Sequence, residues 1–219
     1  MRVRVEDCER VQRHWFELRA GAHGGEVWTD GAMAWTDGPD GLNLMFPAAI
    51  TRDGVERGLD RARRRGLGIV GAWLGLEVDP TPLAEAGFEE GWSPWWMTAD
   101  LASLGSPSDP RITLDPGTGD PAPPRAWYAT ASAGSPAAVV GQVWSFLDGE
   151  LAGVFDMDVR RPFRRQGLGS GLLVAVCDAA RAAGGRHAVL NATPEGKELY
   201  RARGFTQIGE GITWWHHMA

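Results

Sequence analysis

Three glycines on alternate positions follow a cluster of arginines in the stretch RRQGLGSGLL, residues 164–173. The glycines are Gly167, Gly169 and Gly171, and the arginines are Arg160, Arg161, Arg164 and Arg165. Glycine lets the backbone approach a ligand closely, and the first N–H groups of a helix have no partners inside that helix. We expect the N–H groups of residues 166–171 to surround one point at the positive end of the helix dipole. The stretch therefore predicts an anion site that a phosphate would fit.

Three nucleotide-type motifs are alternatives for this loop. A P-loop needs a lysine after its glycines, and none follows here. A dinucleotide fingerprint needs a sixth-position glycine, tight packing on its strand and an acid about twenty residues on. Here Leu172 stands at that position, seven residues separate Val159 from Gly167, and the next strand, HAVLNA, is acid-free. The third pattern, Arg/Gln-x-x-Gly-x-Gly/Ala, is matched by residues 164–169.

The residue patterns around the loop predict the elements that position it. Residues 139–159 contain two extended runs rich in Val, Phe and Trp, which predict an antiparallel hairpin with its turn at 147–150. Residues 170–185 predict a helix that Gly184 and Gly185 stop, and residues 187–192 predict a strand. The apolar stripe of the helix consists of Leu172, Leu173, Val176 and Ala180. The loop therefore connects a strand to the start of a helix.

The same order of elements occurs earlier in the chain. A predicted helix at 53–66, with Val55, Leu59 and Ala62 on one face, precedes the strand IVGAWLG. In both halves a Thr-Pro segment, a Gly-Phe pair and a Trp-Trp pair then follow. These pairs are Gly87-Phe88 and Trp95-Trp96 in the first half, and Gly204-Phe205 and Trp214-Trp215 in the second. The order predicts an internal repeat, although coincidence among common residues is the alternative.

The two copies differ where chemistry could occur. The first has no glycine loop before its helix, and Leu83 stands four residues before its Gly-Phe pair where the second has Tyr200. Residues 103–124 hold six of the fourteen prolines and predict a connector with at most a short strand at RITL. We therefore expect two domains, a degenerate one at 1–104 and an intact one at 105–219.

Composition and charge limit the function classes. A formal net charge of −6 and a pI near 5.4 argue against general binding to nucleic acid or to an anionic membrane surface. Only two cysteines occur, Cys8 and Cys177, which is too few for a disulfide framework, and neither has the company of a metal site. The charged N-terminus lacks the apolar run of a signal peptide, and no stretch resembles a membrane span. We expect a soluble cytoplasmic protein without a metal.

Two segments together, DMDVRRPFRRQGLGSGLL and LNATPEGKELYRARGF, resemble the GCN5-related N-acetyltransferase (GNAT) superfamily. The resemblance covers about residues 125–219 well and the first half only as a faded copy. It implies a GNAT fold of the α/β (α+β) class, in which flanking helices cover a mixed, mostly antiparallel sheet, in a tandem arrangement. It also implies that residues 105–219 form the half that binds acetyl-CoA and catalyses.

The resemblance further implies which residues bind the coenzyme. The loop would hold the pyrophosphate through its backbone N–H groups, and a fourth strand that diverges from the fifth would pair with the pantetheine arm. The implied set is Met157, Asp158, Val159, Arg164, Arg165, Gln166, Gly167, Leu168, Gly169, Ser170 and Thr193. A helix cap alone explains Thr193, and Asn191 is a weaker candidate. For the glycines the alternative is a tight turn without ligand, and for Arg160 and Arg161 it is a solvated basic edge.

The resemblance implies Tyr200 as general acid, whereas Asp156 is the predicted general base from its position on the fourth strand. An O–H donor near the departing sulfur lowers the barrier to thioester attack, whereas the alternative for Tyr200 is an aromatic packed beside Leu199. Asp158 shares a strand face with Asp156 by parity, so either could accept a proton, and both could be partners for arginines. Candidates for the acceptor pocket are Trp127, Tyr128, Trp144, His216 and His217, of which at least one aromatic is expected in the core.

The predicted function is transfer of an acetyl group from acetyl-CoA to a primary amine of a small molecule or peptide, by direct attack in a ternary complex. The alternative from another class is a regulatory or scaffold protein that binds CoA without turnover. A third interpretation makes both halves an interaction platform. The sequence does not identify the acceptor, and it leaves a homodimer open.

Overall fold

The computed structural model describes residues 2–39, 41–105, 109–116 and 125–218. The chain forms two compact units, each from two segments. Unit 1 consists of Met1–Val11 and Trp95–Ile208, and unit 2 consists of Gln12–Pro94 and Gly209–Ala219. These ranges differ from the predicted domains 1–104 and 105–219 because each unit includes a segment from the other side of residue 104. The roles assigned to the two predicted domains stay a prediction, and residues 106–108 and 117–124 of the predicted connector lie outside the described residues.

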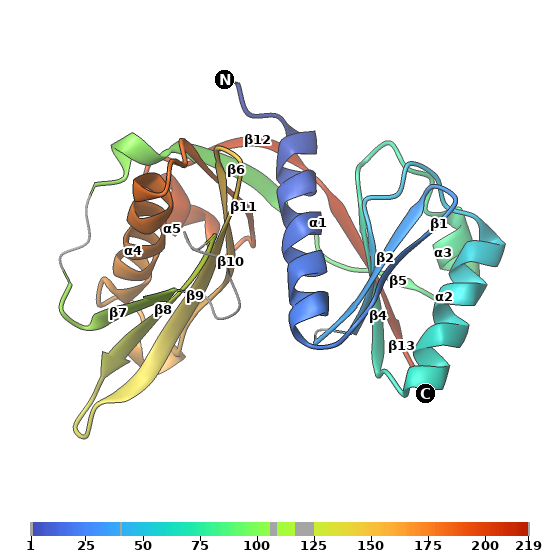
Figure 1. Ribbon diagram of the computed structural model, residues 1–219, viewed down its shortest axis with the longest axis horizontal. Helices are drawn as coiled ribbons and strands as arrows, with labels where there is room; N and C mark the ends of the chain where they lie inside the picture. Colours follow the sequence, from blue (N-terminus) through green and yellow to red (C-terminus); the bar gives the residue numbers. More distant parts are fainter. Residues whose placement is uncertain (1, 40, 106–108, 117–124, 219) are drawn as a thin grey trace. The chain divides into compact units, whose positions relative to one another are not determined.

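Unit 1 contains a seven-stranded sheet in the order β12-β6-β11-β10-β9-β8-β7 (Figure 1). The strands are β6 Trp95–Asp100, β7 Ile112–Pro116, β8 Ala126–Ala133, β9 Ala138–Asp148, β10 Leu151–Val159, β11 His187–Ala192 and β12 Thr206–Glu210. β10 and β11 are parallel, whereas β10 with β9 and β11 with β6 are antiparallel. The hairpin of β9 and β10 turns at Gly149 and ends at Val159, as predicted. RITL contributes to β7.

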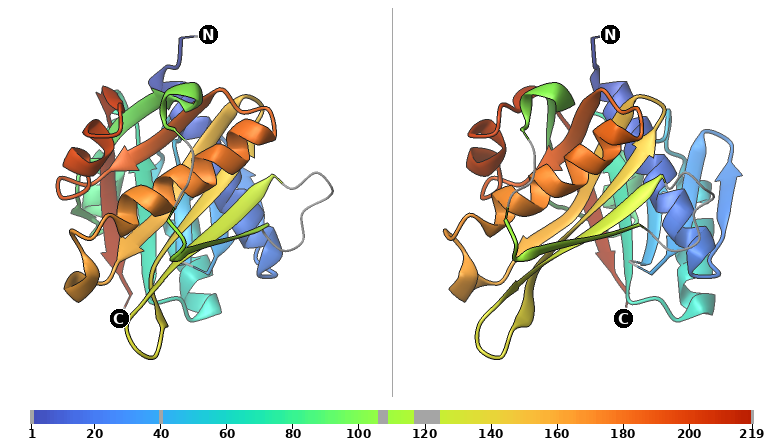
Figure 2. Two further views of the ribbon diagram at one scale, coloured as in Figure 1. Left: turned by 90° about the vertical axis from the view of Figure 1, so that its left-hand side faces the viewer. Right: turned by 60° about the vertical axis from the view of Figure 1, so that its left-hand side comes forward.

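The helix α4, Leu168–Ala182, covers one face of this sheet and contacts β7, β8, β9 and β10 (Figure 2). All four predicted stripe residues are buried, and burial of each leucine side chain is worth about 1.5–3 kcal/mol. The helix begins two residues earlier than predicted, at Leu168. After its last turn Gly184 has φ 102°, and the Gly185 N–H donates to the Ala180 carbonyl at 2.9 Å. This glycine ending is the one predicted.

Unit 2 contains a six-stranded sheet in the order β1-β2-β3-β4-β13-β5 (Figure 1). The strands are β1 Val27–Asp30, β2 Met33–Gly38, β3 Gly41–Met45, β4 Ile69–Leu74, β5 Glu89–Glu90 and β13 Ile212–His217. β3 and β4 are parallel. The helix α2, Arg52–Arg65, buries Val55, Leu59 and Ala62 as predicted, and α3, Thr81–Glu85, contacts it on the same face. Both sheets are therefore mixed and flanked by helices, which confirms the predicted fold class.

The two Trp-Trp strands belong to opposite units. β6 follows β5 along the chain but pairs with β11 in unit 1, where Trp96 is opposite Asn191. β13 follows β12 but pairs with β4 and β5 in unit 2, where Trp215 is opposite Gly71 and Glu89. The repeated order of elements is thus present, and the last strand of each repeat completes the sheet of the other unit.

The helix α1, Val5–Ala22, was not predicted from the charged N-terminal sequence. Its buried residues Cys8, Val11 and Trp15 are spaced three and four apart, which is the signal that could have identified it. Near the C-terminus, α5 spans Lys197–Arg201. Within the described part of the chain, no helix is long and apolar enough to cross a membrane.

Candidate functional site

The start of α4 has no side-chain cap. Gly167 occupies the N-cap position with φ 82°, a left-handed conformation in which an L side chain is strained. The Gly171 N–H donates to the Gly167 carbonyl at 2.9 Å, so this amide belongs to the helix and is unavailable to a ligand, contrary to the prediction. The amides of Leu168, Gly169 and Ser170 come before it in the first turn and have no partner inside an α-helix. These groups are available to an anion.

The parallel strands β10 and β11 separate on the side nearer α4's start. Their pairing joins Leu151–Gly153 to His187–Val189, and among the described residues the register continues no further. β9 follows β10 to its end, where Val159 is opposite Gly141, but a bulge lies between Phe155 and Asp158. Strands β10 and β11 therefore diverge, as the resemblance implies for the strands that bind the pantetheine arm.

The bulge corrects the predicted face of two carboxylates. Between the pairs Phe155–Trp144 and Asp158–Gln142, two residues of β10 lie opposite one residue of β9, and Asp156 has φ 51°. An extra residue interrupts the alternation of side chains, so parity does not place Asp156 and Asp158 on one face. Both residues are exposed. Asp158 is paired with Gln142 of the neighbouring strand β9.

The backbone of Val159 is turned toward the open edge of β10. The Arg160 N–H donates to the Val140 carbonyl of β9 at 2.8 Å, and neighbouring residues of a strand point their N–H and C=O groups to opposite sides. The Val159 carbonyl accepts from Nε of Arg164 at 2.7 Å. Arg164 also donates to Glu195 and lies 3.5 Å from an Asp158 carboxylate oxygen. It therefore connects the end of β10 to the segment after β11.

The other arginines near the loop are not neutralised. Arg160, Arg161 and Arg165 are exposed, and none of them has a carboxylate partner within the described ranges. Arg165 has φ 62°, which is uncommon for a residue with a side chain. Their charges therefore favour an anion at the start of α4, although the chain as a whole is acidic.

Two arginines contact the loop and were missed by sequence reasoning. Nη2 of Arg111, just before β7, donates to the Gln166 carbonyl at 3.0 Å. Nε of Arg203, after α5, donates to Oγ of Ser170 at 3.1 Å. Arg203 lies within the quoted segment YRARGF, whereas Arg111 lies in the proline-rich segment interpreted as a connector. No local pattern marks Arg111, because its partner is 55 residues away.

Tyr200 is buried, with 7% of its surface exposed, and its ring lies 5.7 Å from that of Phe205. Burial raises the pKa of the Tyr200 hydroxyl above its ordinary value, and the nearby Cys177 thiol raises it further. In the part of the chain that the structure describes, this hydroxyl has no hydrogen-bond partner. The group therefore stays protonated at neutral pH, which suits a proton donor and excludes a base. Packing and a donor role are compatible here.

Thr193 closes a turn ahead of α5 and does not cap that helix, whose N-cap is Gly196 without a side-chain hydrogen bond, so the predicted helix start at Thr193 is wrong. Oγ1 of Thr193 accepts from the Gly196 N–H at 3.1 Å, and the Thr193 carbonyl accepts from the Lys197 N–H at 3.1 Å. The helix itself begins later than predicted, at Lys197. Asn191 is half-buried on β11. A contact of either residue with the coenzyme stays a prediction.

The acceptor-pocket candidates occupy different environments. Trp127 is buried in the core of unit 1, which confirms that at least one aromatic packs there. Tyr128 and Trp144 are half-buried neighbours with ring centroids 4.6 Å apart. His216 and His217 belong to unit 2, where Nδ1 of His216 lies 3.1 Å from the Gly87 carbonyl.

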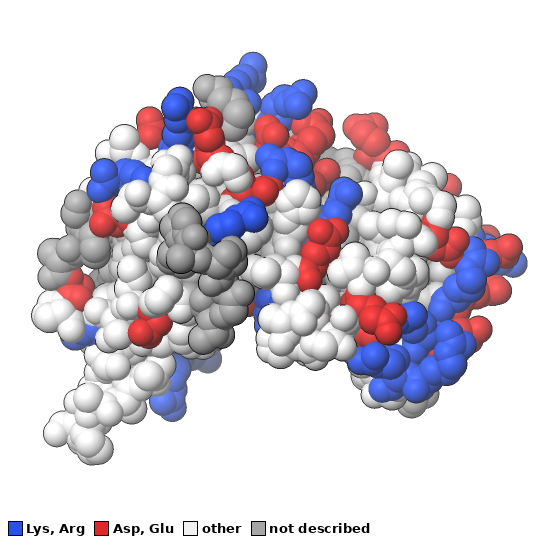
Figure 3. Space-filling model, viewed as in Figure 1, with Lys and Arg blue, Asp and Glu red and all other residues white. Residues whose placement is uncertain are grey.

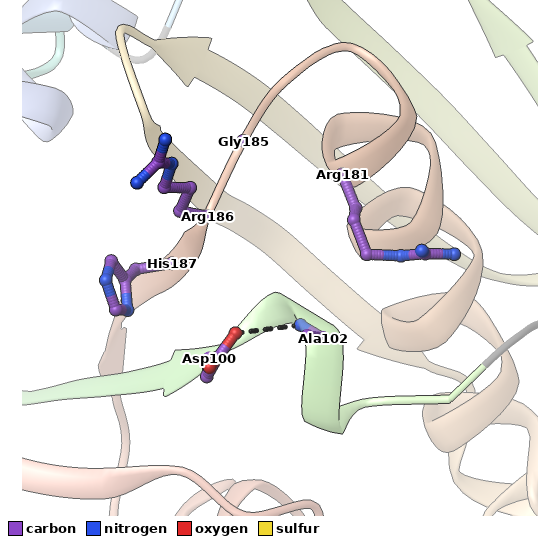
Figure 4. A pocket seen from close by; sticks show the side chains of 6 residues that line it. All are labelled: Asp100, Ala102, Arg181, Gly185, Arg186 and His187. Atoms are coloured by element: carbon purple, nitrogen blue, oxygen red, sulfur yellow. Dashed lines mark hydrogen bonds between the residues drawn. The ribbon is translucent and has the colours of Figure 1, made fainter.

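A pocket of about 300 Å³ lies at the other end of α4 (Figure 4). Its lining consists of Asp100, Ala102, Arg181, Gly185, Arg186 and His187. Arg181 pairs with Asp178, and Arg186 lies 3.0 Å from Glu150, so both charges are balanced. The carbonyl end of a helix also disfavours anions. This pocket is separate from the glycine loop and lacks its features.

Basic residues also gather over α2, at the lower right of Figure 3. The helix carries Arg52, Arg57, Arg61, Arg63, Arg64 and Arg65. Five of them pair with carboxylates, for example Arg57 with Asp30 at 2.6 Å. This surface is therefore largely neutralised, unlike the loop before α4. Among the described residues, no group of three His, Cys, Asp or Glu could hold a metal ion.

Solved structures of other proteins share the fold of this chain. The chain is similar to a GCN5-related N-acetyltransferase from Kribbella flavida, with a TM-score of 0.66 and 15% identity over 96% of this chain and 95% of that one. It is also similar to a GCN5-related N-acetyltransferase-like protein from Streptococcus suis, with a TM-score of 0.60 and 12% identity over 97% and 99% of the chains. A tandem GNAT protein from the clavulanic acid biosynthesis pathway matches with a TM-score of 0.52 and 17% identity over 84% and 77%.

Among curated proteins, no relative matches the chain. At these identities the solved structures show the fold alone, and the two sheets are compatible with a tandem arrangement. The family model of the acetyltransferase (GNAT) family matches residues 83–205, which is more than half of the 219 residues. The chain therefore belongs to the acetyltransferase (GNAT) family.

Proposed function

We propose that this protein is a cytoplasmic N-acetyltransferase that transfers the acetyl group of acetyl-CoA to a primary amine of a small molecule or peptide. The observation that carries the proposal is the uncapped start of α4 beside the diverging strands β10 and β11. An elongated coenzyme with an anionic end fits amides and arginines at one end and open strand edges at the other. Both cysteines are buried free thiols, which fits a reducing compartment.

The backbone of unit 1 would hold the coenzyme. Amides of Gln166 to Ser170 would bind the diphosphate, assisted by the charges of Arg160, Arg161 and Arg165, which have no carboxylate partner among the described residues. The backbone of Met157, Asp158 and Val159 would pair with the pantetheine arm, and Thr193 lies on the segment after β11. Because the Val159 carbonyl already accepts from Arg164, we expect that side chain to move or share this acceptor when the coenzyme binds.

Acetyl-CoA supplies an activated thioester, in which the C–S bond breaks as the amine nitrogen forms the amide bond. Tyr200 would donate its hydroxyl proton toward the departing sulfur, because burial keeps that proton in place at neutral pH. Asp156, exposed at the bulge, would take the proton that the amine releases, directly or through a water. Both roles act within a single ternary complex.

The test is release of free thiol from acetyl-CoA in the presence of a panel of amines, aminoglycosides, amino acids and peptides. Turnover with one acceptor class, together with calorimetric binding of CoA at one site per chain, would support the proposal. Coenzyme binding without turnover by any acceptor would favour a regulatory or scaffold protein instead. Failure to bind any CoA ester would overturn both.

A further inference from the structure

A tight turn at residues 109–112 lies directly against the start of α4. A Cβ at Gly171 would be 3.1 Å from Cγ1 of Ile112 and 3.5 Å from Cβ of Asp109, so the first turn of the helix and this turn are in van der Waals contact. The Arg111 carbonyl accepts from the Ser132 N–H of β8 at 2.9 Å. The turn is therefore attached to the sheet on one side and to the helix on the other.

The side chain of Arg111 is fixed by Asp109. One carboxylate oxygen accepts from the Arg111 N–H at 3.0 Å and from Nε at 2.9 Å, and the other accepts from Nη2 at 2.7 Å. Arg111 holds the pKa of the Asp109 carboxyl at about 2 through these hydrogen bonds. A two-pronged pair of this kind fixes the plane of the guanidinium.

The second hydrogen of Nη2 is directed at the loop. It donates to the Gln166 carbonyl at 3.0 Å, while the first is bound to Asp109. In a trans peptide the carbonyl of one residue and the N–H of the next point in opposite directions. The hydrogen bond to the Gln166 carbonyl therefore turns the Gly167 N–H away from Arg111.

The backbone around Gln166 is in a conformation that needs a hydrogen bond of this kind to stabilise it. Arg165 and Gly167, on either side of Gln166, have φ 62° and 82°. A residue with a side chain is strained in this region and persists there only where its surroundings fix it. Arg164 is tied to Val159 and Glu195 before the strained residue, and Arg111 holds the carbonyl after it.

We propose that Arg111, fixed by Asp109, is a positioning residue that orients the loop at 165–167 for the diphosphate of the coenzyme. This inference rests on the proposed function of the loop. It assigns part of the segment predicted as a connector to the coenzyme site. Arg111 acts through the Gln166 peptide, so it affects coenzyme affinity and leaves the chemical step unchanged.

The experiment compares two acyl donors and two substitutions. Arg111→Gln is expected to raise the KM for acetyl-CoA about tenfold, within the range for a lost charge-assisted hydrogen bond, with kcat unchanged at saturation. With S-acetylpantetheine, which lacks the diphosphate, kcat/KM is expected to match the wild type. Arg111→Lys keeps the charge but not the fork and is expected to resemble Arg111→Gln. The acceptor is the best amine from the panel.

The matched control is Arg181→Gln, which removes the same charge from the far end of α4, where Arg181 pairs with Asp178. Its KM is expected to match the wild type. Asp109→Asn, expected to raise KM about threefold by loosening the fork, serves if Arg111→Gln does not fold. If Arg111→Lys had the wild-type KM, the effect of Arg111 would be charge attraction and not positioning. If Arg111→Gln lowered kcat/KM equally with both acyl donors, the substitution would have damaged the protein generally. Either result, or an unchanged KM, would overturn the inference. A wild-type protein that binds no CoA would instead overturn the proposed function.

Discussion

The helices α2 and α4 occupy corresponding places in the two repeats but begin differently. Thr51 caps α2 with an extended backbone, φ −117°, and its Oγ1 accepts from the Gly54 N–H at 3.2 Å. Gly167 caps α4 in the left-handed region and offers no side-chain acceptor. The hydroxyl of Thr51 therefore satisfies a first-turn amide of α2, whereas no side chain caps the first-turn amides of α4.

The parallel strand pairs differ in the same sense. β3 and β4 pair over Leu42–Met45 and Val70–Trp73, and the Phe46 N–H extends the contact to the Trp73 carbonyl at 2.8 Å. β10 and β11 pair over three residues and then diverge. Paired strands use their backbone groups in hydrogen bonds to each other, so of these two described pairs the one in unit 1 leaves open the strand edges that we propose for the coenzyme arm.

The Gly-Phe turns, by contrast, are nearly identical. Gly87 and Gly204 have φ 84° and 86°, and the following Phe N–H donates to Leu83 at 3.0 Å and to Tyr200 at 3.1 Å. Both residues that accept these bonds are buried. The repeats therefore share what the fold needs and differ in the cap, the strand edge and the hydroxyl. These three features are the ones to which the proposed function assigns a role.

The largest expected effect comes from dividing the chain at the predicted domain boundary. A fragment of residues 105–219 lacks β6, which lies between β11 and β12 in the sheet of unit 1. Its loss leaves unpaired backbone groups and an uncovered core, so the fragment should aggregate or remain unfolded. Circular dichroism and proton NMR would measure this, with residues 93–208, which retain β6, as the comparison. A well-folded 105–219 fragment that binds CoA would contradict the expectation.

The next effect distinguishes the open helix start from the capped one. A Cβ at Gly169 would lie 3.4 Å from Leu199 and 3.9 Å from Val159, which is ordinary contact. Gly169→Glu would extend a negative charge between β10 and α5, so CoA binding by calorimetry should be abolished. Gly169→Ala, which fits, should retain binding at one site per chain. Two sites per chain, or binding by the Glu variant, would contradict the assignment.

Tyr200 and Leu83 occupy corresponding positions in the two repeats, and the hydroxyl that only Tyr200 carries should affect turnover. Tyr200→Phe keeps the ring beside Phe205 but removes the proton donor, so kcat should fall about a hundredfold while the Kd for CoA stays the same. Steady-state kinetics and calorimetry on one preparation separate the two quantities. If the tyrosine only packs, kcat will not change, and Tyr200 leaves the mechanism.

The cap of α2 should affect stability alone. Thr51→Ala removes the acceptor of the Gly54 N–H and should lower the free energy of unfolding by about 1 kcal/mol. Coenzyme affinity should not change, because the amides proposed to bind the coenzyme belong to α4. Urea unfolding and calorimetry measure both, and a weakened Kd for CoA would show that the caps do not divide the roles of the two helices.

The smallest expected effect is on the stability of the protein as a function of pH, through the titration of buried groups in unit 1. Burial raises the pKa of the Cys8 and Cys177 thiols from 9.0 to about 12 and raises that of Tyr200 above 10. Above pH 9 the unfolded chain loses protons that the folded chain retains, so stability falls as pH rises and is unaffected below pH 8. The urea midpoint of unfolding should decline from pH 8 to pH 9.5 and pH 10.5, and it should decline less steeply in Cys177→Ala. A flat profile in the wild type would be inconsistent with this.

Local patterns allowed much of the fold and the site to be predicted from the sequence. The stripe of α4, the turn at Gly149 and the glycine ending after Ala182 each depend on residues within a few positions of one another. The same holds for the glycine loop, whose spacing fixes an uncapped helix start. Such features are set by backbone sterics and short-range hydrogen bonds, so the order of residues is sufficient.

The tertiary structure alone decided which distant groups meet. The sequence could not assign β6 to unit 1, because strand pairing depends on which edges are unsatisfied after the rest has folded. The bulge beside Asp156 arises from the ladder with β9, and the raised pKa of Tyr200 arises from burial by the core. Arg111 reaches Gln166 across 55 residues only because β7 pairs at the sheet edge beside α4. The sequence determined the amides of the site, and long-range packing determined what holds them in place.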